Sequence, residues 1–386
     1  SLKLRFENLF PIPSYNSYSY YNLKMINCVY IHIPFCEKKC NYCAFCSFNL
    51  LKYKKEYIKA LIKEIKFYYK NEYLQTIYFG GGTPSLLETK DIEDILVNFN
   101  FDKNTQITIE LNPYNLTNEK LYDYKILNIN RLSLGVQSFL NNELKILGRT
   151  HLKNEIYEAI ENINKLNFNN FSIDLMYGIP EQNTKTWEYS LNEALKLNTP
   201  HISLYGLKIE DGTYFKKYPP KNLPDMDIQA DMYEFAVKKL NSKYLHYEFS
   251  NFAINKLYYS KHNLAYWERK NYYGFGLSAS GFIENKRYTN TFNFKGYLKI
   301  PFLKIYEFLP LKIQIKEEFF FGLRLKKGID FNYLNQKYNI DIYNKYQKIF
   351  NKYTEAGYMQ KTDKGINLTL KGIMVSNEIL CEFIET

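Results

Sequence analysis

The chain has 386 residues, of which 46% are hydrophobic and 24% charged, and its formal net charge is +11. This length can bury a large core and favours two domains, one of about 200 to 300 residues and one smaller. The lysines are spread among Asn, Ile and Tyr residues without a basic stripe, which argues against a nucleic-acid partner. Any contact with a membrane is expected to be peripheral.

The cysteines and the apolar pattern restrict the location of the protein. The six cysteines are crowded toward one segment, which does not fit a disulfide framework and indicates a reducing compartment. No window has the roughly 18 uncharged apolar residues that a membrane-spanning helix needs. Residues 1–27 are rich in Ser and Tyr and form either the remnant of an organelle-targeting extension or a loose arm. We expect a cytoplasmic protein or, with a targeting remnant, one in a mitochondrial or plastid matrix.

From residue 28 to residue 224 short β-rich runs alternate with amphipathic helical stretches, the pattern of a parallel α/β sheet. Helices are predicted, for example, over 54–70 and 185–197, where apolar residues recur every three or four positions. Six such units are fewer than the eight of a closed barrel. We therefore predict an α/β fold with an open, partial (β/α)6 TIM-like barrel, whose chemistry lies at the carboxyl ends of its strands. The predicted strands are 28–34, 76–82, 106–113, 129–138, 171–178 and 201–209.

The pattern changes after residue 224. Residues 225–300 contain a predicted helix over 227–243 and then an irregular aromatic stretch, and we treat them as a separate region. Residues 301–386 read as short helices followed by two short strands, punctuated by Gly357 and Gly365, and a last helix. This order predicts a smaller α+β domain resembling a winged helix. Because the charge is not concentrated there, packing or partner docking is favoured over DNA binding.

Cys36, Cys40 and Cys43 form the spacing CxxxCxxC immediately after the first predicted strand. Three thiolates hold three irons of a cubane [4Fe–4S] cluster and leave the fourth iron open to a small molecule, whereas a closed site takes four protein ligands. A zinc site that includes Cys46, or inert thiols, are the alternatives. Zinc sites usually draw a second ligand pair from far along the chain, and Cys28 and Cys381 offer no such pair. The spacing resembles that of radical S-adenosylmethionine (SAM) enzymes.

The remaining motifs make this resemblance more specific. They recur in the same order in the family of oxygen-independent coproporphyrinogen III oxidase and its heme-chaperone relatives, and they cover nearly all of the chain after Cys28. The segments are YIHIPFCEKKCNYC, YFGGGTPS, IELNP, RLSLGVQSF with LGRTH, DLMYGIP, HISLYGLKIEDGT, YEFSNFA and HNLAYW.

The resemblance implies a SAM site around the cluster. A glycine run at a strand end lets backbone approach a ligand closely, and in relatives this run cradles the SAM amino group. Corresponding residues at other strand ends contact SAM, and two tyrosines pack against it. The alternatives for these side chains are a solvated rim, internal salt bridges or plain core. The residues implied are Gly81, Gly82 and Thr83 in the run, Glu110, Gln137, Arg149 and Asp174 at other strand ends, and Tyr30 and Tyr42 beside the cluster loop.

Two features favour the heme-chaperone branch over the oxidase branch. The oxidases carry a fourth cysteine at the position of Phe45, and here the extra thiol is Cys46, one residue later. The segment HNLAYW resembles the heme-binding signature of the chaperones, which implies His262 as an iron ligand. Asn263, Tyr266 and Trp267 complete this signature, and the aromatic pair suits a heme plane.

One loop departs from the family. Relatives read GIGPGAHS where this chain reads GFGLSASG, so that Ser278 replaces a glycine and Ser280 a histidine. A serine cannot ligate iron as an imidazole does, and whatever that loop does in relatives is therefore in doubt.

The resemblance implies a protein that binds a [4Fe–4S] cluster, SAM and heme and delivers heme to an acceptor hemoprotein, with an electron donor for the cluster. The alternative within the family is a coproporphyrinogen III dehydrogenase, which removes two propionate carboxyl groups. A third hypothesis is a basic, zinc-containing protein that binds nucleic acid through the C-terminal domain.

Overall fold

The computed structural model describes residues 25–114 and 116–385. The predicted N-terminal extension, residues 1–27, therefore lies almost entirely outside the described residues.

The core of the fold is a curved sheet of nine strands, in which β1 to β6 lie side by side in chain order and run parallel. The six predicted strands are thus confirmed, and they form the partial barrel. β9 extends the sheet beside β1 in parallel, and β8 extends it beside β6 in the antiparallel direction. In spatial order the strands are β7 (Leu245–His246), β8 (Asn251–Ala253), β6 (His201–Gly206), β5 (Phe171–Tyr177), β4 (Arg131–Gln137), β3 (Gln106–Leu111), β2 (Thr76–Gly81), β1 (Cys28–Ile33) and β9 (Tyr273–Phe275).

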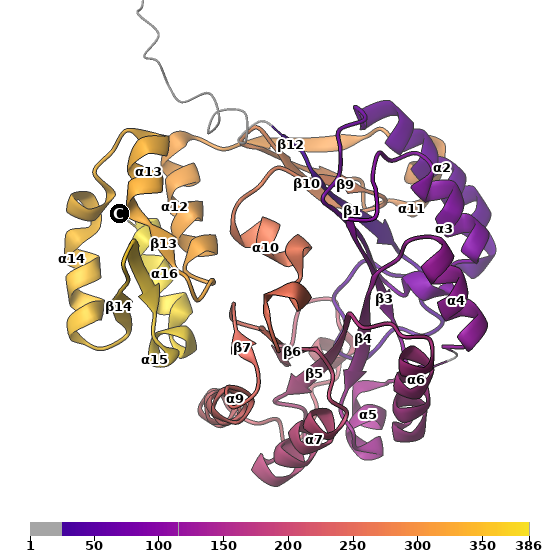
Figure 1. The fold of residues 1–386 in the computed structure, drawn as a ribbon, viewed down its shortest axis with the longest axis horizontal. Helices are drawn as coiled ribbons and strands as arrows, with labels where there is room; N and C mark the ends of the chain where they lie inside the picture. Colours follow the sequence, from indigo (N-terminus) through magenta and orange to yellow (C-terminus); the bar gives the residue numbers. More distant parts are fainter. Residues whose placement is uncertain (1–24, 115, 386) are drawn as a thin grey trace, which may run out of the picture.

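Helices cover the outer face of this sheet (Figure 1). Each strand alternates between apolar side chains in the hydrophobic core, such as Ile31, Phe79 and Ile109, and polar ones on the inner face, such as Glu110. The helices bury an apolar stripe on the outer side, for example Leu61 and Ile65 of α2. These helices are α2 (Lys54–Tyr68), α3 (Thr89–Leu96), α4 (Asn118–Ile126), α5 (Asn141–Leu147), α6 (Lys153–Lys165), α7 (Thr184–Lys196) and α9 (Met226–Leu240).

The predicted irregular stretch after α9 has regular structure. A short helix, α10 (Lys261–Trp267), precedes β9, and a three-stranded antiparallel sheet follows. Its last strand, β12 (Lys304–Phe308), lies beyond residue 300 in the chain but pairs with β11. The segment after Pro301 therefore packs with the preceding region. The remaining elements of this region are the 3₁₀ turn η3 (Lys256–Tyr258), β10 (Ser280–Ile283), β11 (Lys286–Asn290) and α11 (Phe294–Lys299). Three short elements belong to the barrel instead: the 3₁₀ turns η1 (Leu51–Tyr53) and η2 (Pro84–Leu86), and the helix α8 (Tyr214–Lys217).

The C-terminal domain has the element order of a winged helix: helix, strand, two helices and two strands. The three strands pair in the order β13, β15, β14, so the last strand lies in the middle. The elements are α12 (Leu311–Gly322), β13 (Ile329–Asp330), α13 (Phe331–Tyr338), α14 (Ile342–Glu355), β14 (Met359–Lys361) and β15 (Gly365–Leu368), followed by α15 (Leu370–Met374) and α16 (Ser376–Glu385). The predicted small α+β domain is confirmed.

Helix α10 lies between the open inner side of the barrel and the C-terminal domain (Figure 1). It packs against β2 on one side and α12 on the other. Within residues 25–114 and 116–385, no helix is both long and apolar enough to cross a bilayer.

Candidate functional site

The three cysteines of the CxxxCxxC motif lie in the loop that follows β1, and each is partly exposed. The loop is held at its base and near its middle, because Cys36 N–H donates to the carbonyl of Phe48 and Asn41 N–H to that of Leu147. In the described part of the chain, no three His, Cys, Asp or Glu side chains converge on one metal ion. The cysteines of a cubane each bind a different iron, so they need not converge on one point.

A chain of side-chain contacts joins this loop to the ends of three strands. Cys36 Sγ lies 3.6 Å from Thr83 Oγ1, and Asn112 Nδ2 donates to the same hydroxyl at 3.4 Å. Arg149 donates to Asn112 Oδ1 at 2.6 Å and to the carbonyl of Gly135 at 2.8 Å. Its other terminal nitrogen donates to Cys40 Sγ at 3.5 Å, so the guanidinium lies against a cluster thiol. The structure thus brings together the predicted cysteines, Thr83 and Arg149.

The glycine run at the end of β2 is required by close packing. Gly81 has φ +113°, and a Cβ there would lie 2.6 Å from the ring of His32. At Gly82 a Cβ would lie 2.6 Å from the carbonyl oxygen of Phe35. The N–H groups of Gly81, Gly82 and Thr83 donate to Glu110, Ile33 and Phe35, respectively. The run can therefore offer carbonyl oxygens to a ligand, and an ammonium group requires such acceptors.

Glu110 and Asp174 point to the inner face of the barrel. Glu110 accepts hydrogen bonds from Tyr78 at 2.8 Å and from Gly81 N–H at 3.2 Å. Burial raises the pKa of Glu110 to about 7, against the lowering effect of the Tyr78 hydroxyl. Asp174 lies in the middle of β5 rather than at its end, where it accepts a hydrogen bond from Ser133 at 3.3 Å, and burial raises its pKa. Asp174 therefore lies deeper in the barrel than the sequence predicted.

Two polar atoms next to the cluster loop have no hydrogen-bond partner although they are buried: Gln137 Oε1 and Arg149 Nε. Gln137 follows an irregularity in the β4–β5 pairing and has φ +67°, so its backbone departs from the strand. An unpaired buried amide oxygen is costly unless a ligand supplies a donor. These orphaned atoms, with the glycine carbonyls and the Arg149 contact to Cys40, fit a cluster and an amino-acid-bearing nucleoside such as SAM.

The two predicted packing tyrosines lie on different sides of this site. Tyr42, within the cluster loop, packs beside a small cluster that contains Leu147 and Met176. Tyr30 of β1 donates or accepts a hydrogen bond with His32 Nδ1 at 3.0 Å, and its ring stacks on that of Tyr78. His32 in turn bonds the carbonyl of Cys46 at 2.8 Å. Tyr30 and His32 therefore support the cluster loop from within the barrel.

His262 of α10 is buried inside the barrel, with both ring nitrogens hydrogen-bonded. Nδ1 lies 2.8 Å from Thr76 Oγ1 and Nε2 lies 2.8 Å from the Tyr266 hydroxyl. Its ring stacks on Tyr78, with centroids 5.0 Å apart. Burial, together with the positive charge of Arg131, lowers the pKa of His262 to about 3, so the imidazole is neutral.

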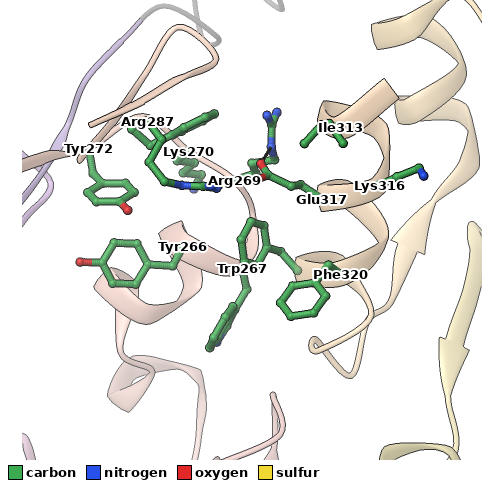
Figure 2. Close-up of a pocket in the computed structure, with 12 residues that line it drawn as sticks. Tyr266, Trp267, Arg269, Lys270, Tyr272, Arg287, Ile313, Lys316, Glu317 and Phe320 are labelled. Atoms are coloured by element: carbon green, nitrogen blue, oxygen red, sulfur yellow. Dashed lines mark hydrogen bonds and ion pairs between the residues drawn. The ribbon is translucent and has the colours of Figure 1, made fainter. Parts of the chain in front are cut away.

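The other predicted residues of this segment divide between two surfaces. Tyr266 and Trp267 line a cavity of about 530 Å³ between α10, the β10–β11 hairpin and α12, whereas His262 and Asn263 do not line it. Figure 2 shows Trp267 and Phe320 side by side in this cavity. Its walls are mainly aromatic and its remaining lining is mainly cationic. The full lining is Tyr266, Trp267, Arg269, Lys270, Tyr272, Phe282, Arg287, Ile313, Lys316, Glu317, Phe320 and Phe321.

The departures from the family pattern have simple structural settings. Ser278 has φ +60°, the left-handed conformation that a glycine adopts freely. Ser280 begins β10 and its hydroxyl lies 3.0 Å from that of Thr289, away from the cavity lining. Phe45, at the position of the oxidase cysteine, is 67% exposed.

Sequence reasoning missed several residues of these sites. Asn112 holds Arg149, and its position directly after a strand could have indicated it. Arg269, Arg287 and Phe320 of the cavity come from α10's end, β11 and α12, and no local motif links them.

Comparisons with known proteins agree with this arrangement. Residues 30–194 match the radical SAM superfamily, and residues 309–375 match the HemN C-terminal domain. The heme chaperone HemW of Lactococcus lactis is 35% identical over 374 residues, which cover 94% of this chain and 98% of that protein. HemW of Bacillus subtilis is 34% identical, with 92% of this chain and 98% of that protein covered. The structure of Escherichia coli coproporphyrinogen III oxidase (HemN), a radical SAM enzyme, superposes with a TM-score of 0.82 at 21% identity, over 93% of this chain and 90% of that one. At this identity the structural likeness shows the fold alone.

Proposed function

The chain belongs to the HemW heme chaperones of the radical SAM superfamily, and on that premise we propose that it binds a [4Fe–4S] cluster, SAM and heme and delivers heme to an acceptor hemoprotein. The observation that carries this proposal is the cavity lined by Tyr266 and Trp267. This cavity lies between the HNLAYW segment and the C-terminal domain, and its lining combines aromatic with cationic side chains. Its volume of about 530 Å³ lies in the range of small-molecule and cofactor sites.

Cys36, Cys40 and Cys43 would hold the cluster, and the strand ends around them would hold SAM. When bound, the cluster would supply the electron for reductive cleavage of SAM. Arg149 donates a hydrogen bond to Cys40 Sγ, so its guanidinium would lie beside the cluster. Carbonyls of Gly81 and Gly82 would accept from the amino group, and Gln137 Oε1 would accept from a hydroxyl. Tyr30, Tyr42 and Asp174 would orient the ligand from the barrel side.

His262 would ligate the heme iron through its imidazole, and Asn263 would contribute to the heme site from the same segment. Because its Nε2 atom is bonded to Tyr266, ligation requires that this hydrogen bond opens and that Tyr266 turns away. A neutral imidazole is the form that binds iron, and the low pKa of His262 provides it.

The proposed partners are heme, an acceptor hemoprotein and an electron donor for the cluster. Nucleic acid is not among them, and contact with a membrane would be peripheral. The proposed location is the cytoplasm or an organelle matrix, because the cluster needs a reducing compartment.

The test is an anaerobic incubation of the cluster-loaded protein with SAM and either hemin or coproporphyrinogen III. Stable stoichiometric hemin binding without porphyrinogen turnover supports the chaperone. Formation of protoporphyrinogen would instead show a coproporphyrinogen III dehydrogenase. Zinc without iron and acid-labile sulfide in the purified protein would favour the zinc-containing alternative.

A further inference from the structure

Glu317 of α12 bridges two arginines at the edge of the heme cavity. Its Oε2 accepts from Arg269 Nε at 2.9 Å, and its Oε1 accepts from Arg287 Nη2 at 2.5 Å. Figure 2 shows these side chains meeting above Trp267, with Arg287 coming from β11 and Glu317 from the facing helix. One carboxylate therefore occupies a position between two guanidinium groups from different parts of the fold.

Cationic side chains predominate among the charged residues that line the cavity. Arg269, Lys270, Arg287 and Lys316 all line the cavity, and Glu317 is the carboxylate in the same lining. Arg269 has a side chain that is 2% exposed, and its Nη2 atom is buried without a hydrogen-bond partner. A buried guanidinium nitrogen without an acceptor is unfavourable, so this position fits a further carboxylate oxygen.

Heme has the matching chemistry. Its macrocycle is planar and apolar, and its two propionate side chains end in carboxylates. Trp267, Phe282, Phe320 and Phe321 provide aromatic surface for the macrocycle, and the arginine pair lies at the edge of this surface. Arginine suits carboxylates because its planar donors can pair with both oxygens.

Resting on the proposed function, we infer that Arg269 and Arg287 recognise a heme propionate. In the heme-free protein the carboxylate of Glu317 occupies the position between the two arginines that this propionate takes. When heme binds, its propionate replaces the carboxylate of Glu317 between the two arginines. Arg269 keeps its bonds to Glu318 Oε1 at 3.4 Å and Asn285 Oδ1 at 3.2 Å during this exchange, so it remains in position. Arg287 is 32% exposed and also pairs with Glu307 at 3.4 Å, so it can follow the incoming propionate.

The test compares hemin with hemin dimethyl ester, in which both carboxylates are blocked, by anaerobic absorbance titration of the full cluster-loaded chain. Wild type is expected to bind hemin at least roughly tenfold more tightly than the ester, the effect of one charge-assisted pair. Arg287→Ala should weaken the binding of hemin by a similar factor and leave the affinity for the ester unchanged. Glu317→Gln should tighten hemin binding, because the resident competitor loses its charge, whereas a purely structural role predicts weaker binding.

Glu307→Gln is the matched control, because Glu307 also pairs with Arg287 but does not line the cavity. It should leave both affinities unchanged. Thermal melting of each variant identifies a loss of folding, and if Glu317→Gln unfolds, Arg287→Ala decides alone. Equal wild-type affinities for hemin and the ester, or equal losses for both in Arg287→Ala, would overturn the inference. Failure of both ligands to bind would overturn the proposed function instead.

Discussion

The Nε2 atom of His262 is hydrogen-bonded to the hydroxyl of Tyr266 at 2.8 Å, one helical turn further along α10. The bond links a side chain inside the barrel to one that lines the cavity facing the C-terminal domain. The HNLAYW segment is therefore a connection between the barrel and the proposed heme site, with its residues on two surfaces.

Replacing His262 tests this connection. If His262 ligates the iron, His262→Ala should change the spin state and the Soret band of bound heme and weaken its binding, because an axial nitrogen is lost. The cluster absorbance should persist, since His262 does not contact the cluster loop. Absorbance and electron paramagnetic resonance spectra of the heme-loaded variant provide the measurement. Spectra identical to those of the wild type would move the iron ligand to another residue.

Removal of one cluster cysteine should abolish cluster binding. In Cys40→Ala the third thiolate is missing and Arg149 loses its sulfur partner, so the brown absorbance near roughly 400 nm and SAM cleavage should both disappear. Cys46→Ala is the control, because the Cys46 side chain packs against the core and its carbonyl, which remains, accepts from His32. A Cys40→Ala protein with an intact cluster would contradict the ligand assignment.

Gly81→Ala should weaken SAM binding. Its Cβ would lie 2.6 Å from the His32 ring, and the residue has φ +113°, so the strand end and the cluster loop must shift. We expect the protein to lose roughly 1 to 3 kcal/mol of stability and SAM affinity to fall by at least about tenfold. Isothermal titration with SAM and thermal melting measure the two effects. Gly212→Ala, at φ +78° with no atom within 4 Å of the added Cβ, carries backbone strain alone and should keep SAM affinity.

Glu110 should make stability depend on pH. Burial raises its pKa in the folded protein from 4.5 to about 7, so between these values the folded state binds more protons than the unfolded state. Stability should therefore fall as the pH rises from about 4.5 to about 7 and level off above, by roughly 3 kcal/mol for this residue. Glu110→Gln should flatten part of this decline in urea unfolding at several pH values.

Glu248 provides a comparison for this measurement, because burial also raises its pKa to about 7. Glu248→Gln should flatten a similar part of the decline without affecting the SAM site. A Glu110→Gln protein with the same pH profile as the wild type would show that the pKa of Glu110 is not raised in the folded protein.

The sequence predicted the barrel well because its signals are local. Each parallel strand is buried on its outer side and carries its own alternation, as in β3, and the helices carry regular apolar stripes. The confirmed family resemblance likewise depends on short motifs at strand ends. By contrast, the region around α10 lacks such periodicity, and its short elements are held by long-range contacts such as that of the Gln106 side chain with the carbonyl of Tyr259.

By itself the sequence determined the six parallel strands and the family, since backbone periodicity and short motifs are properties of adjacent residues. The cluster cysteines stay a prediction that rests on the same kind of local spacing. Only the tertiary structure decided that His262 lies inside the barrel while Tyr266 and Trp267 face a cavity. It alone also joined Arg269, Arg287 and Glu317, because residues from α10's end, β11 and α12 meet only after the C-terminal domain has packed against the barrel.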